Sequence, residues 1–123
     1  MKSIRMGIVA MLAVVASLTA AIAPANAGAF VAWSVTDVPP DDTLNVRAWP
    51  SSQSQILVAY PNNTVLSMTG KCTGGVDLRA VAGWPAWKQR QLVRYQWCET
   101  WIDPHGNGEY RTAWVYGKYI RPA

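Results

Sequence analysis

The fold of this chain is decided by the stretch Leu44-Asn45-Val46-Arg47-Ala48-Trp49-Pro50. Apolar and polar side chains alternate over its first four residues, and the run then ends at a proline followed by Ser51-Ser52-Gln53-Ser54. Alternation places one set of side chains on each face of a strand, and a proline with small polar neighbours is typical of a turn. The stretch therefore predicts a half-buried β-strand that runs into a turn.

Similar stretches lie on both sides of this one. They are rich in β-branched and aromatic residues and are bounded by Pro, Gly, Asn or Asp, and we interpret them as strands: 29–36, 55–60, 64–70, 97–102, 109–116 and 119–121. Asn107-Gly108 is a strong hairpin turn signal between two of them. The chain is therefore predicted to be mostly β, a small, partly open barrel formed by five to six of these short strands.

Residues 73–96 interrupt the strand pattern and are predicted to form an insertion. Within it, residues 85–95 suit a short helix better than a strand, because proline is favoured at a first helical position and the large apolar side chains then share one face. That predicted face consists of Trp84, Trp87, Leu92 and Tyr95. The opposite face would carry Lys88, Arg90 and Arg94.

The first 27 residues have the pattern of a secretory signal. Two basic residues precede an apolar run from Met6 to Ile22, and the small-residue site Ala25-Asn26-Ala27 follows. The alternative is an uncleaved membrane anchor, because the apolar run is long for a signal core. Cleavage after Ala27 would leave residues 28–123 as a single domain, periplasmic or secreted.

The charge of that domain is small. Without the two basic residues of the signal, nine basic residues remain against seven acidic ones, a net charge of about +2. A weak excess spread along the chain does not indicate nucleic acid as a partner.

Two cysteines, Cys72 and Cys98, belong to the predicted exported part, where an even count favours a disulfide. A metal pair or a reactive thiol are the alternatives, and neither has support, because His105 is the only histidine and no other ligand lies at metal-site spacing. Residues 103–108 resemble a calcium loop, but Trp114 stands where a bidentate glutamate is needed. We predict no metal and no cofactor.

Catalytic residues are not evident. A nucleophile needs a histidine and an orienting group beside it, and the cysteines are expected to be consumed in the disulfide. Glu99 and Asp103 are the only near pair of carboxylates on consecutive elements, and solvated strand-edge charges are the better interpretation. The sequence therefore predicts a binding protein and not an enzyme.

The seven tryptophans are the compositional excess that needs an explanation. Burial is expected for Trp33, Trp97 and Trp114, which lie within strands. Exposed aromatic rings can stack on sugar rings or hold an extended peptide. The predicted ligand surface consists of Trp49, Tyr60, Trp101, Trp114 and Tyr116. A second predicted surface, for a protein partner, consists of Trp84, Trp87, Lys88, Arg90 and Arg94.

Several of these motifs together resemble the bacterial Src-homology-three domain family. They are Leu44-Asn45-Val46-Arg47 with Pro50, the strand at 56–59, Ala113-Trp114-Val115, and Tyr119-Ile120. The pair Cys72 and Trp97-Cys98 looks like a disulfide-bearing exported branch of the family. Members often have glycine where this chain has Trp49, and usually Gly-Trp-Val in place of Ala113-Trp114-Val115. A tryptophan at such a turn needs a permissive backbone angle or must be held by contacts.

The resemblance implies a recognition module for cell-wall peptide or glycan. The first expectation is therefore a non-catalytic module of the cell envelope that binds peptidoglycan or another wall ligand through its aromatic surface. The alternative is an interaction or structural module that docks another envelope protein through residues 73–96. The sequence indicates no oligomeric state.

Overall fold

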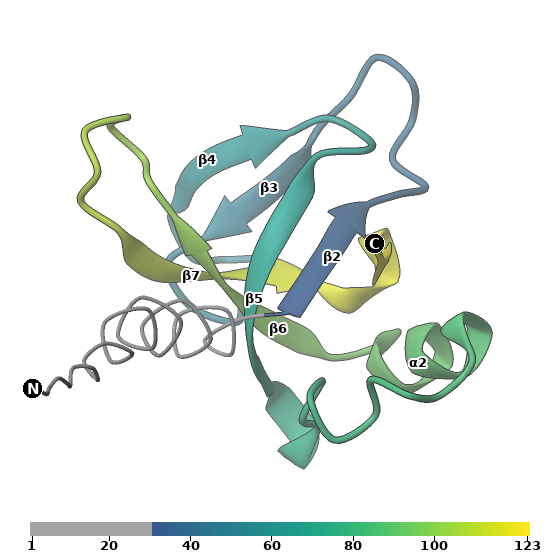
Figure 1. Ribbon diagram of the computed structural model, residues 1–123. Helices are drawn as coiled ribbons and strands as arrows, with labels where there is room; N and C mark the ends of the chain where they lie inside the picture. The colour runs from purple at the N-terminus through teal and green to yellow at the C-terminus, as the bar shows by residue number, and fades with distance from the viewer. Residues whose placement is uncertain (1–30) are drawn as a thin grey trace, which may run out of the picture.

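Seven antiparallel strands form one sheet in the computed structural model, which describes residues 31–123 (Figure 1). The strands are β2 (Val31–Val35), β3 (Leu44–Arg47), β4 (Ile56–Tyr60), β5 (Val65–Cys72), β6 (Trp97–Ile102), β7 (Arg111–Tyr116) and β8 (Ile120–Pro122). Their order across the sheet is β4-β3-β7-β6-β5-β2-β8, and the two outermost strands do not pair. The predicted mostly-β, partly open fold is confirmed, with seven strands in place of five to six. The predicted signal, residues 1–27, lies outside the described residues.

Strand β3 has the alternating burial that its sequence predicts. Leu44 and Val46 are buried, whereas Asn45 and Arg47 are half-buried on the other face. The strand pairs with β4 on one side and meets β7 on the other, where Arg47 lies opposite Trp114. This second pairing joins residues far apart in the chain and so brings the first half of the chain to the second.

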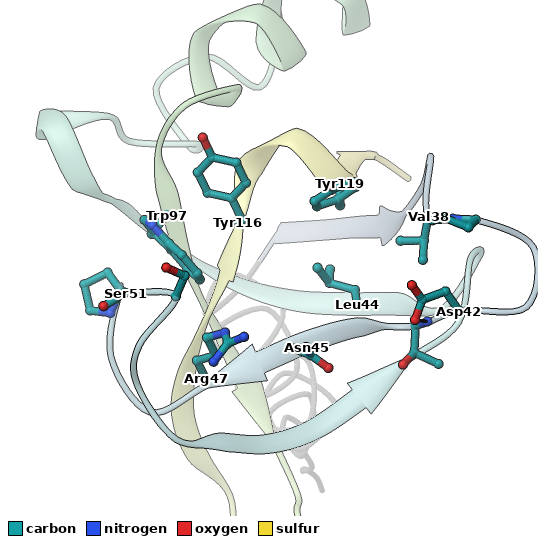
Figure 2. A pocket seen from close by; sticks show the side chains of 13 residues that line it. Val38, Asp42, Leu44, Asn45, Arg47, Ser51, Trp97, Tyr116 and Tyr119 are labelled. Atoms are coloured by element: carbon teal, nitrogen blue, oxygen red, sulfur yellow. Dashed lines mark hydrogen bonds between the residues drawn. The ribbon is translucent and has the colours of Figure 1, made fainter.

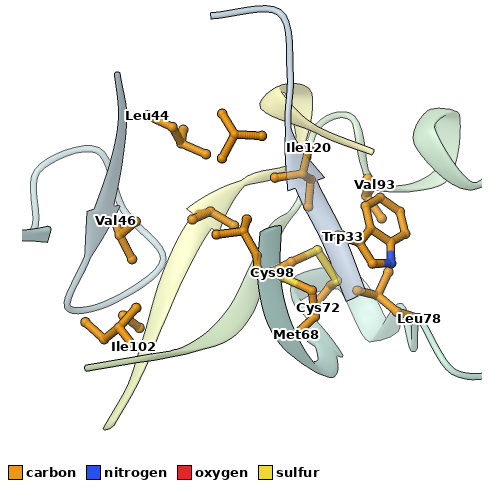
Figure 3. Close-up of a cluster of buried hydrophobic side chains, with 14 of the residues drawn as sticks. Trp33, Leu44, Val46, Met68, Cys72, Leu78, Val93, Cys98, Ile102 and Ile120 are labelled. Carbon is orange, nitrogen blue, oxygen red and sulfur yellow. A yellow bond between two sulfur atoms is a disulfide. The ribbon is translucent and has the colours of Figure 1, made fainter. Parts of the chain in front are cut away.

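The hydrophobic core lies on the inner face of the curved sheet (Figure 3). Its largest fully buried side chains are Trp33, Met68, Leu78, Ile102 and Ile120. Burial of an aliphatic or aromatic side chain of this size stabilises a fold by roughly 1.5–3 kcal/mol. The expected burial of Trp33 is confirmed, but Trp97 and Trp114 are half-buried on the outer face and not in the core.

The disulfide between Cys72 and Cys98 is present and lies within the core. The two cysteines face each other across β5 and β6. They also stand at the two ends of the insertion, so the bond closes its base.

The insertion contains a 3-10 turn, η1 (Thr73–Gly75), and one helix, α2 (Ala86–Val93), which confirms a helical segment there. Pro85 was expected at the first helical position, but it lies one residue before the helix and has an extended ψ of 145°. The predicted apolar face is also wrong. The helix buries Gln89 and Val93, and leaves three large aromatic residues exposed: Trp84, Trp87 and Tyr95.

Two contacts explain which side of α2 is buried. The helix packs against β8 and against the 3-10 turn η2 (Gly117–Tyr119), where Val93 joins the core. The side-chain amide of Gln89 donates hydrogen bonds to the carbonyl oxygens of Ala82 and Trp84, at 3.3 Å and 2.8 Å. The polar side chain of Gln89 is thus buried because it donates hydrogen bonds to carbonyl groups of the loop before the helix. No helix within residues 31–123 is long and apolar enough to cross a membrane.

Candidate binding groove

A groove of about 610 Å³ opens on the side of the barrel where β3 begins (Figure 2). The loop before β3 and the strand itself form one side, with Val38, Asp42 and Asn45 among the lining residues. The turn after β3, at residues 50–52, closes one end. The opposite side is a wall of aromatic rings.

The aromatic wall consists of Trp97, Tyr116 and Tyr119. Trp97 and Tyr116 lie directly opposite each other on β6 and β7, and their ring centroids are 5.2 Å apart with planes tilted by 54°. The ring of Tyr119 follows at 6.4 Å from that of Tyr116. Tilted pairs at these distances are favourable and hold one another in place. The wall is therefore a continuous apolar surface with phenolic hydroxyls at its edge.

Turn η2 places Tyr119 in this wall. Gly117 begins the turn directly after β7 and sends the chain back into β8, so that Tyr119 packs partly against the core. The ammonium group of Lys118 lies 5.6 Å from the centroid of the Tyr119 ring. The position of the ring is thus set by the turn and not by the alternation of a strand.

Two charged groups lie toward opposite ends of the groove (Figure 2). The guanidinium Nη1 of Arg47 donates a hydrogen bond to the carbonyl oxygen of Ser54, 2.7 Å away, which orients the group and leaves other N–H donors for a ligand. The carboxylate of Asp42 accepts a hydrogen bond from the backbone N–H of Thr43 at 2.8 Å. The groove can therefore receive a ligand with an anionic group at one end and a cationic group at the other.

Trp49 projects from the turn that closes the groove, with 64% of its surface exposed. Its φ is not positive, so the turn needs no glycine at this position. Contacts hold it instead: the Trp49 N–H donates to Ser54 Oγ, and that hydroxyl donates in turn to the carbonyl oxygen of Trp49 at 2.8 Å. Trp49 is therefore held in this turn by contacts and does not depend on a special backbone angle.

The five residues of the predicted ligand surface do not form one patch. Tyr116 lines the groove, and Trp101 and Trp114 share its face of the sheet, because Trp101 lies opposite Thr112 and Trp114 opposite Glu99. The Lys71 ammonium group lies 5.9 Å from the centroid of a Trp114 ring. Trp49 stands beside the groove.

Tyr60 lies apart from the other four. It is opposite Leu44 in the sheet and packs against the core cluster. Burial, and to a smaller extent the charge of Asp103, raise the pKa of its phenol. Tyr60 is the last residue of β4 and is half-buried.

Two of the three rings of the aromatic wall are not in the predicted ligand surface. Trp97 was expected in the core because it lies within a strand, and Tyr119 was named only as part of the Tyr119-Ile120 motif. The alternation of β6 carries the missing signal for Trp97, since Cys98, Thr100 and Ile102 are buried and the residue before Cys98 must face outward. For Tyr119 the alternation ends at η2, so no strand pattern could place it.

The two carboxylates considered for catalysis have structural partners. Glu99 Oε1 accepts a hydrogen bond from Thr69 Oγ1 at 3.0 Å. The carboxylate of Asp103 accepts the N–H groups of Asn107 and Gly108, at 3.1 Å and 2.9 Å, and so closes the β6–β7 loop. In the described part of the chain, no group of three acidic, histidine or cysteine side chains is arranged to hold a metal ion.

The residues of the second predicted surface lie around α2. A hollow of about 580 Å³ is lined by Trp87, Arg90 and Arg94 together with Asp37 and Lys118. Arg90 forms an ion pair with Asp37, which ties the helix to the β2–β3 loop. Trp84 and Lys88 lie outside the hollow and contact each other, with the ammonium group 4.5 Å from the centroid of the indole ring.

Comparisons of this chain with protein-family models, with curated proteins and with solved structures find no match.

Proposed function

We propose that the protein is a non-catalytic binding module of the bacterial cell envelope and that its groove binds peptide or glycan of the cell wall. The observation that carries the proposal is the aromatic wall of Trp97, Tyr116 and Tyr119, which lines the groove opposite the β3 side, where Asp42 and Arg47 lie toward its two ends. Aromatic rings provide contact area for an extended chain or a sugar ring at little entropic cost. The resemblance to bacterial Src-homology-three domains supports the same class of ligand.

The charges of Asp42 and Arg47 favour the peptide part of peptidoglycan as the part of the ligand that the groove recognises. Wall stem peptides carry carboxylate and amino groups on a short extended backbone. Arg47 is suited to a carboxylate, because its planar guanidinium can donate two parallel hydrogen bonds, and Asp42 is suited to an ammonium group. Export agrees with this role: the predicted signal sends the chain out of the cytoplasm, and the Cys72–Cys98 disulfide is typical of an oxidising compartment.

Co-sedimentation of the oxidised protein with purified peptidoglycan sacculi, over a series of salt concentrations, tests the proposal. We expect pelleting that persists at high salt, because aromatic contacts are not screened as exposed charges are. Tyr116→Ala should weaken binding about tenfold or more, equivalent to about 1.4 kcal/mol. Tyr110→Ala is the matched control, since Tyr110 is exposed but does not line the groove.

Other outcomes would contradict the proposal. Pelleting that disappears with modest salt would mean only charge attraction, and equal binding by the Tyr116 and Tyr110 variants would exclude the groove. Trp49→Ala extends the test to the turn beside the groove. The alternative function, docking of an envelope protein through residues 73–96, stays a prediction; it requires that deletion of 76–94 abolish capture of that protein while sacculus binding persists.

A further inference from the structure

The segment around α2 concentrates positive charge. Between Leu78 and Cys98 the sequence has four basic residues and no acidic one. Apart from the nearby Asp37 and Asp77, the acidic side chains lie elsewhere on the barrel, at Asp41, Asp42, Glu99, Asp103 and Glu109. The net charge of the domain is small, but its distribution is uneven. An excess of this kind on one projecting element attracts an anionic surface.

Three basic residues on or beside the helix are available for a partner: Lys88, Arg94 and Lys118. Arg90 is neutralised by its ion pair with Asp37. Lys88 and Arg94 form no ion pair within residues 31–123, and neither does Lys118, which lines the same hollow as Arg94. The hollow thus holds one acidic side chain against three basic ones. An anionic group placed there would neutralise charge that the fold leaves uncompensated.

Exposed aromatic rings accompany these charges. Trp87 is 67% exposed, and Trp84 and Tyr95 also face solvent at the two ends of the helix. Two of the rings are paired with cations: Lys88 lies over Trp84, and the Arg94 guanidinium lies 5.7 Å from the Tyr95 ring centroid. Tryptophan and tyrosine beside lysine and arginine are typical of the membrane–water interface, where rings sit at headgroup level and cations meet phosphate.

We propose that the α2 segment docks on a membrane surface that contains anionic phospholipids, with Lys88, Arg94 and Lys118 against the lipid phosphates and Trp87 inserted among the headgroups. The rings are distributed along a projecting helix and not gathered in one desolvated pocket, which favours a fluid surface over a protein hot spot. In Figure 1, α2 lies on the side of the barrel away from β4.

Co-sedimentation of the oxidised protein with lipid vesicles tests the proposal. Vesicles of phosphatidylcholine alone are compared with vesicles that contain a third phosphatidylglycerol. We expect binding to the anionic vesicles only. Lys88→Gln/Arg94→Gln should weaken it about thirtyfold, since each basic residue near an anionic surface contributes about fivefold. Arg111→Gln, on the exposed start of β7, is the charge control and should leave more than half of the affinity.

The aromatic part has its own matched pair. Trp87→Ala should weaken vesicle binding several-fold and Tyr110→Ala should not, although the two side chains are almost equally exposed, at 67% and 66%. Quenching of tryptophan fluorescence by brominated lipid should fall in Trp87→Phe. Equal binding to both vesicle types, or unchanged binding of the Lys88/Arg94 variant, would overturn the proposal. So would binding that 10 mM inorganic phosphate abolishes, because the ligand would then be a free anion. None of these outcomes depends on sacculus binding.

Discussion

Gly117 lies so close to the C-terminus of α2 that a Cβ atom on it would stand 1.8 Å from the carbonyl oxygen of Val93. Two hydrogen bonds fix this approach: the Gly117 N–H donates to the Gln96 carbonyl oxygen at 2.7 Å, and the Gln96 N–H donates to that of Val93 at 2.8 Å. The atoms that a side chain would meet are backbone and cannot turn aside. The insertion can therefore pack against the barrel only because residue 117 has no side chain.

Gly117→Ala should consequently destabilise the protein by about 3 kcal/mol, at the upper end of the cost of overpacking. Urea unfolding followed by tryptophan fluorescence measures the change. Gly83→Ala is the matched control, because a methyl group at position 83 would have no atom within 4 Å and Gly83 has no positive φ. The free energy of unfolding of this variant should stay within about 0.5 kcal/mol of that of the parent. Equal stability of the two variants would show that α2 does not pack as described.

The disulfide should contribute mainly by closing the base of the insertion. Cys72 and Cys98 lie 26 positions apart in the sequence, and the chain-entropy model gives about 3.5 kcal/mol for a loop of this size. Reduction should lower the free energy of unfolding by that amount and speed amide hydrogen exchange within residues 73–97. The Cys72→Ala/Cys98→Ala protein should have the same free energy of unfolding as the reduced parent, and reductant should not change it. A midpoint of unfolding that reductant does not change would contradict this prediction.

Ser54 should be the most sensitive residue of the turn beside the groove. Its side chain is buried, and its hydroxyl accepts from the Trp49 N–H and shares its proton between the carbonyl oxygens of Trp49 and Ser51. Ser54→Ala leaves the Trp49 N–H without a partner, although the two carbonyl oxygens keep backbone donors, and should cost about 1–2 kcal/mol of stability. Ser52→Ala, at an exposed position of the same turn, should cost less than about 0.5 kcal/mol. Denaturant midpoints compare the two.

The strands were predictable because alternation depends only on which face is buried. Leu44 and Val46 are apolar and alternate with polar residues, so the local sequence alone predicts that they face the core. The helix face was not predictable. Trp84 and Trp87 are apolar enough to be buried, but α2 meets a glycine-containing turn that accommodates Val93 and leaves no space for indole rings.

The groove could be only partly predicted, for a related reason. Two rings of its aromatic wall, Trp97 and Tyr116, lie on β6 and β7, and strand alternation identifies the outward position of Tyr116. The opposite side comes from Val38 to Arg47, far earlier in the chain, and only the pairing of β3 with β7 brings the two together. Local sequence patterns predict which face of a strand is buried. A groove also depends on which loops, distant in the sequence, come together beside that strand.

Tyr60 makes the stability of the fold sensitive to alkaline pH. Its pKa in the folded protein is raised above the ordinary value of 10.0, first by burial and then by Asp103. Below pH 10 the phenol is neutral in both states, and its contribution to stability is complete. As the pH rises through 10 toward the folded pKa, the unfolded chain loses the proton and the folded chain keeps it, so stability falls.

Tyr60→Phe should remove this part of the alkaline loss, and unfolding midpoints between pH 9 and 11.5 measure it. Asp103→Asn should lower the phenol pKa only slightly, because burial is the larger cause. Spectrophotometric titration at 295 nm follows the phenolate directly, with Tyr110→Phe as the reference for an exposed ring. If the Tyr60→Phe and Tyr110→Phe proteins lost stability equally with rising pH, Tyr60 would be as accessible to solvent as Tyr110, and its place against the core would be wrong.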